Sequence, residues 1–74
     1  MSTPTYSASR PVASDSREVI DAAVRAATEE LRETLHRHGI DVSFDEIAQL
    51  GHTESWDDEG QRWVNVDWEG AEAG

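Results

Sequence analysis

The feature that most restricts the fold of this chain is a long stretch of helical period, DSREVIDAAVRAATEELRETLHRHG, over residues 15–39. Apolar and small residues recur there three and four positions apart, which predicts an amphipathic helix over about residues 16–38. Asp15 with Glu18 matches a capping box, and Gly39 can supply the left-handed residue that ends many helices. The predicted buried stripe consists of Ile20, Ala23, Val24, Ala27, Leu31, Thr34, Leu35 and His38.

A second, shorter helix is predicted directly after the first. Residues 40–51, IDVSFDEIAQLG, begin with a short extended piece and continue with Ser43 and Glu46 at the spacing of another capping box. A helix of one to two turns follows and ends at Gly51. Its apolar residues are Phe44, Ile47, Ala48 and Leu50.

The C-terminal third predicts an antiparallel β-hairpin. Residues 62–68, RWVNVDW, alternate strictly, which is the period of a strand. DDEG before them is turn-forming, and HTESW before that supplies the outgoing strand, so we expect strands over 52–56 and 62–68. We expect Val64, Val66 and Trp68 to cover the long helix, and Trp56 to join that core or to pair across the hairpin. Trp63 then points outward with Asn65 and Asp67, either as a binding anchor or as a cross-strand packing partner.

The chain outside these elements has the composition of flexible termini. MSTPTYSASRPVASD lacks the apolar run of a signal peptide and is rich in Ser, Thr, Pro and Ala. We therefore expect a disordered arm over 1–14, one small α+β domain over 15–69 and a disordered tail over 70–74. Because the chain has no cysteine, neither disulfides nor a thiolate zinc site stabilise this domain.

Charge is distributed unevenly along the chain. The net charge is −10, and residues 39–74 hold ten acids and only Arg62, which leaves −9 in that part. Such a surface argues against direct binding of nucleic acid or anionic lipid and permits a basic protein partner. No apolar run approaches the roughly 18 residues of a membrane span, so we expect a cytoplasmic protein without membrane contact. All six basic residues are arginine, as high-GC coding in actinobacteria and their phages favours.

The sequence predicts neither a metal site nor a catalytic one. His36 and His38 are two positions apart on a helix, so their side chains diverge by about 200° and do not share a metal. The acids at 57–59 lack the ligand spacing of a calcium-binding loop. No nucleophile has a base at hand, and no glycine-rich phosphate loop is present. We therefore predict no enzyme activity, no catalytic residue and no cofactor.

Two resemblances provide alternatives. VSFDEIAQLGHTES, residues 42–55, resembles the approach to the phosphopantetheine serine of acyl and peptidyl carrier proteins, which would imply a prosthetic group on Ser55. The motif is broken, and RWVNVDW has strand character where carrier proteins have a helix. An acidic helical segment before a Trp-rich end also resembles precursor peptides of ribosomally made natural products, although no Ser/Thr-rich core or clear cleavage site is present.

The composition favours a non-catalytic acidic interaction module that regulates or inhibits a basic, nucleic-acid-binding protein. Antitoxins, immunity proteins, nuclease inhibitors and phage-encoded nucleic-acid mimics share the principle that fixed carboxylates replace phosphates. An alternative is a small assembly subunit that forms a homodimer through the helix stripe at Leu31 and Leu35, and another is acidity that serves solubility alone. With Trp63 as aromatic anchor, the predicted partner-binding residues are Glu54, Asp57, Asp58, Glu59, Trp63, Asp67 and Glu69.

Overall fold

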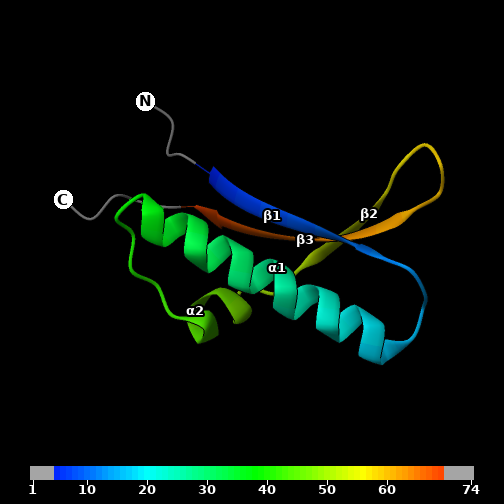
Figure 1. Cartoon of the computed structure of the whole chain (residues 1–74), viewed down its shortest axis with the longest axis horizontal. Helices are drawn as coiled ribbons and strands as arrows, with labels where there is room; N and C mark the ends of the chain where they lie inside the picture. The colour runs from blue at the N-terminus through cyan, green and yellow to red at the C-terminus, as the bar shows by residue number, and fades with distance from the viewer. Residues whose placement is uncertain (1–4, 70–74) are drawn as a thin grey trace.

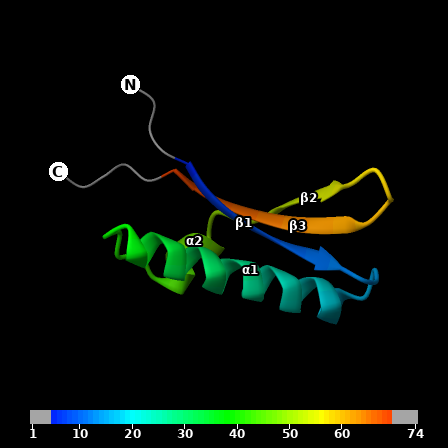
Figure 2. The same ribbon diagram turned by 45° about the horizontal axis from the view of Figure 1, so that its top comes forward.

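The protein has an α+β fold, as the sequence predicts. The computed structural model describes residues 5–69. In chain order the elements are β1 (Thr5–Val12), α1 (Arg17–Arg37), α2 (Phe44–Ala48), β2 (Thr53–Trp56) and β3 (Arg62–Glu69). The strands form an antiparallel sheet in the order β1-β3-β2. Both helices lie on the same side of this sheet, with α1 running along β1 and β3 (Figures 1 and 2).

The prediction of a disordered arm over 1–14 is wrong over β1. Residues 5–12 pair with β3, and Ala8 lies opposite Val66 in the ladder. Ala8 and Val12 are buried, so this strand contributes to the core. The domain therefore includes Thr5–Val12, and its predicted start at residue 15 is wrong. Residues 1–4 of the predicted arm, and the predicted tail 70–74, lie outside the described residues.

The predicted long helix is confirmed as α1, with a different N-terminus from the one expected. Ser16 is the N-cap and makes no side-chain capping bond, so the predicted Asp15–Glu18 capping box is wrong. The Asp15 carboxylate instead accepts a hydrogen bond of 2.7 Å from Arg62. At the other end Gly39 has a φ of +79°. The Ile40 amide donates to the Leu35 carbonyl at 2.8 Å, which completes a Schellman-type ending.

The core lies between α1 and the inner face of the sheet. Ala27, Leu31 and Leu35 of the predicted stripe are fully buried, while His38 at its end is exposed. Thr28 is also buried, and its hydroxyl donates to the Val24 carbonyl at 2.7 Å, so its burial leaves no unpaired hydroxyl. Burying a leucine completely contributes about 1.5–3 kcal/mol. The remaining buried apolar residues are Ala8, Val12, Ile47, Val64 and Val66.

The short helix and the hairpin are also confirmed. The Ser43 hydroxyl accepts from the Glu46 amide at 3.2 Å, and the Glu46 carboxylate accepts from the Ser43 amide at 3.0 Å. This reciprocal capping box starts α2, which inserts Ile47 into the core. The hairpin strands at Thr53–Trp56 and Arg62–Glu69 agree with the predicted 52–56 and 62–68 within one residue at each end.

Among the elements that the structure describes, no helix covers the second face of the sheet (Figure 2). Strand side chains alternate between faces, so the buried Val64 and Val66 place Trp63, Asn65 and Asp67 on this open face. The ladder register adds residues of the neighbouring strands to the same face. They are mostly small and polar: Thr5, Ser7, Ser9, Pro11, Thr53 and Ser55.

Candidate interaction surface at the hairpin end

Asp57 builds the turn that joins β2 to β3. One carboxylate oxygen accepts from the backbone amides of Glu59 and Gln61, at 3.0 and 2.9 Å. The other accepts from the Trp63 indole N–H at 3.1 Å. The indole hydrogen bond, followed by the Gln61 amide bond, holds the pKa of Asp57 below its ordinary value because both bonds favour the ionised form. Asp57 is therefore a structural residue of the turn.

The other two carboxylates of the turn extend into solvent. Asp58 and Glu59 are exposed. The turn that carries them closes through the Gly60 amide, which donates to the Asp57 carbonyl at 3.0 Å, and Gly60 has the positive φ, +82°, that glycine adopts without strain. Two negative groups are thus displayed on a hydrogen-bonded turn.

Arg62, the single basic residue among the carboxylates of residues 54–70, connects the hairpin to the start of α1. Its guanidinium forms an ion pair with Asp15 at 2.7 Å and a second one with Glu54. It also lies 5.5 Å from the centre of the Trp56 ring, a cation–π arrangement. Among the described residues, its Nε is a buried nitrogen without a hydrogen-bond partner. Arg62 thus holds two strands and the β1–α1 connection together.

The prediction that Trp56 belongs to the core is wrong. Trp56 is 61% exposed, because β2 extends beyond the region that α1 covers (Figure 1). It borders a recess of about 290 Å³ together with Asp15, Gly60 and Arg62. Trp68, in contrast, packs partly buried against the core, as predicted. The most exposed large aromatic side chain of the described chain is therefore Trp56.

The predicted binding residues lie on different faces of the molecule. Trp63, Asp67 and Glu69 share the open face of the sheet, where Trp63 is half-buried and its Cα partners are Pro11 and Ser55. Glu54 lies on the opposite face, which the helices cover, and forms an ion pair with Arg62.

The hairpin end of the described chain carries exposed carboxylates and an exposed tryptophan. It groups Asp58 and Glu59 with Trp56 and Asp15; only Asp58 and Glu59 of these four are among the predicted binding residues. The contribution of Asp15 could not be found from local sequence, since its ion pair joins residues 47 positions apart. We call this set the hairpin-end surface.

Within residues 5–69, no three His, Asp or Glu side chains are grouped so that they could hold a metal ion. His36 instead pairs with Asp41 at 3.1 Å, and His38 lies with its ring centre 5.0 Å from that of Tyr6. No helix in this part of the chain has both the length and the apolar character needed to cross a bilayer.

Comparison with known proteins provides no relative for this chain. No protein-family model, curated protein or solved structure matches it.

Proposed function

We propose that this protein is a non-catalytic acidic interaction module that regulates or inhibits a basic, nucleic-acid-binding protein. The partner would meet the hairpin-end surface, with Asp58 and Glu59 as exposed charges and Trp56 as the aromatic contact. The observation that carries the proposal is the construction of the turn: three hydrogen bonds to the Asp57 carboxylate hold the neighbouring carboxylates on a defined backbone.

Fixed carboxylates suit a mimic of the phosphate backbone. A basic groove binds phosphates largely through charge, and a rigid anion array can occupy the same groove without the entropy cost of ordering a flexible tail. Aromatic residues with a large exposed ring are frequent contact centres in protein interfaces. Two further exposed carboxylates, Asp67 and Glu69, lie on the open sheet face toward the other end of β3.

The experiment compares charge removal at the hairpin end with equal charge removal elsewhere. The double variant Asp58→Asn, Glu59→Gln removes two charges and leaves Asp57, which builds the turn, unchanged. The control, Glu18→Gln with Asp21→Asn, removes two charges from exposed positions of α1. A partner captured from the native host at low salt, then purified, is titrated against all three proteins.

We expect the hairpin-end variant to bind about tenfold more weakly, since two interface charges of about 0.7 kcal/mol each correspond to that factor. The control should bind like the unmodified protein, and affinity should fall as salt rises. The captured protein should also lose bound DNA or RNA when this protein is added. Equal affinity of both double variants would contradict the proposal.

The structure bears on the alternatives as well. The helix stripe is not a free dimerisation surface, because Leu31 and Leu35 are 0% exposed within a single chain. The Ser55 position that a carrier protein would modify lies in β2, and β3 is a strand where carrier proteins have a helix. No observation favours the precursor-peptide alternative. The interaction module is therefore the function that the described residues support best.

A further inference from the structure

Within residues 5–69, β1 leaves one long edge of the sheet unpaired. β3 is the central strand, so β1 and β2 are the edges. β2 has four residues and β1 has eight, and no other element of the described chain lies along the outer side of β1 (Figure 1). An unpaired edge presents a row of backbone N–H and C=O groups that can pair with a further strand.

The direction of these backbone groups follows from two hydrogen bonds at the hairpin. The Gln61 carbonyl accepts from the Asp57 amide at 3.0 Å, so it faces β2, and the next residue, Arg62, faces β1. Arg62 is the Cα partner of Val12, whose carbonyl faces β3 and accepts from the Gln61 side chain at 2.8 Å. Successive residues alternate along a strand, so the outward-facing backbone groups belong to Thr5, Ser7, Ser9 and Pro11.

This edge has little protection against pairing. Natural edge strands are commonly short, bulged, or guarded by lysine and proline. β1 has a single proline, Pro11, near one end, and Pro11 occupies an outward position where its missing N–H costs β1 no bond to β3. The outward amides of Thr5, Ser7 and Ser9 remain. Arg10, the one charged residue of the strand, has its side chain on the helix side.

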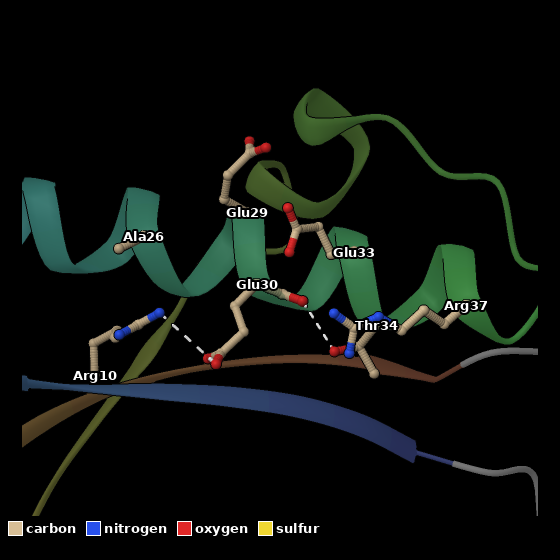
Figure 3. A pocket seen from close by; sticks show the side chains of 7 residues that line it. All are labelled: Arg10, Ala26, Glu29, Glu30, Glu33, Thr34 and Arg37. Carbon is tan, nitrogen blue, oxygen red and sulfur yellow. Dashed lines mark hydrogen bonds and ion pairs between the residues drawn. The ribbon is translucent and has the colours of Figure 1, made fainter.

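Beside this edge lies a groove of about 430 Å³ whose charges have both signs (Figure 3). Arg10 and Arg37 border it together with Glu29, Glu30 and Glu33. The Arg10–Glu30 pair is loose, at 3.7 Å, and each of these side chains is about half exposed. The groove lies on the β1 side of α1, where the side chains of an added strand would rest.

We propose that two copies of this chain associate through their β1 edges into one six-stranded antiparallel sheet, with the two α1 helices side by side on one face. The mixed charges argue for a second copy as the occupant. A two-fold axis places the groove of one copy against the groove of the other, so Arg10 and Arg37 of each can meet carboxylates of its partner. Because two arginines offset two of its three carboxylates, the groove offers a strongly basic strand only a small net attraction.

The outward backbone groups permit a register in which Ala8 lies at the two-fold axis. With Ala8 at the two-fold axis, Ser7 of one copy lies opposite Ser9 of the other, and Thr5 lies opposite Pro11. The outward amides of Thr5, Ser7 and Ser9 then all find carbonyl acceptors, while the missing N–H of Pro11 leaves only the Thr5 carbonyl unbonded in each copy. This inference does not depend on the proposed function, since edge pairing uses the outward backbone groups of Thr5, Ser7, Ser9 and Pro11, and none of these residues belongs to the hairpin-end surface.

Salt separates self-association from partner binding. Each copy has a net charge of −10, so added salt screens repulsion between copies and should strengthen the dimer. Binding of a basic partner should weaken under the same change. The experiments can therefore refute self-association and partner binding independently of each other.

The test uses sedimentation equilibrium of the full chain from low to high micromolar concentration. Ser7→Pro removes an outward amide from each copy, in a position like that of Pro11, whereas Ser7→Ala retains the amide. We expect a concentration-dependent dimer for the unmodified chain and for Ser7→Ala. For Ser7→Pro, two lost hydrogen bonds should weaken dimerisation about tenfold or more.

A second pair of variants tests the groove without altering the strand. Arg37→Glu reverses a groove charge, and Arg25→Glu makes the same change at an exposed position of α1 outside the groove. We expect only Arg37→Glu to weaken the dimer. A chain that stays monomeric at the highest concentration and at high salt overturns the proposal. Equal dimerisation constants for folded Ser7→Pro and Ser7→Ala, or for folded Arg37→Glu and Arg25→Glu, also overturn it.

Discussion

The contribution of β1 to the core can be measured with the substitution Val12→Ala. Val12 is 3% exposed, at the end of a strand whose sequence resembles a flexible tail. The change removes two methyl groups from a buried site, and each buried carbon of this kind stabilises the fold by about 0.8 kcal/mol. The transfer term is therefore about 1.6 kcal/mol, and the cavity left behind raises the cost to about 2 kcal/mol. For a domain of this size we expect the melting temperature to fall by about 10 °C.

The measurement is urea unfolding at low micromolar concentration, followed by tryptophan fluorescence and far-UV circular dichroism. Ser7→Ala is the matched control, because Ser7 lies on the exposed face of the same strand and its change should cost less than about 0.5 kcal/mol. If Val12→Ala costs no more than Ser7→Ala, residues 5–12 do not pack as the structure places them, and both the strand and the edge-pairing inference fail.

Three further predictions concern the core and the hairpin. Leu31→Ala should cost about 3–5 kcal/mol, comparable to the whole stability of so small a domain, so circular dichroism should show a largely unfolded chain. Trp68→Ala should lower the free energy of unfolding by more than about 2 kcal/mol, and Trp56→Ala by less than about 1 kcal/mol, in the same urea assay. The pKa of Asp57 is lowered in the folded state, so its ionised carboxylate stabilises the fold at pH values above the ordinary aspartate pKa of about 3.9. This contribution to the free energy of unfolding is lost as the pH falls through the lowered pKa. Asp57→Asn should therefore reduce the loss of stability on acidification, which urea unfolding between about pH 5 and pH 2 measures; an unchanged acid limb would refute this role.

Local signals account for the elements that the sequence predicts well. A helix of 21 residues is visible from its own period, and its ending at Gly39 follows from conformational preferences of adjacent residues. The Ser43–Glu46 capping box spans four residues, and the hairpin connects strands through a short turn. In each case the interacting groups are close in sequence, so their residue types alone specify the contact.

The candidate site could be predicted only in part, because some of its features depend on contacts between residues far apart in the sequence. The acidic turn was identifiable because DDEG both forms turns and has charge. Its exposed neighbours were not, since Trp56 reads as an apolar strand residue and becomes exposed only because α1 does not extend over that end of β2. Asp15 reads as a helix cap and becomes an acidic site residue only because folding brings it to Arg62.

The amino-acid sequence by itself determined the two helices, the hairpin and the excess of carboxylates in the C-terminal half. The tertiary structure alone decided that TYSASRPV is a strand. That segment mixes strand-favouring Thr5, Tyr6 and Val12 with Ser, Ala, Arg and Pro, and it becomes a strand because Ala8 and Val12 are buried and because β3, about 50 residues away, supplies its hydrogen-bond partners. Because this strand depends on pairing with distant residues, its own sequence does not suffice to predict it. The free edge that this pairing creates cannot be predicted from that sequence either.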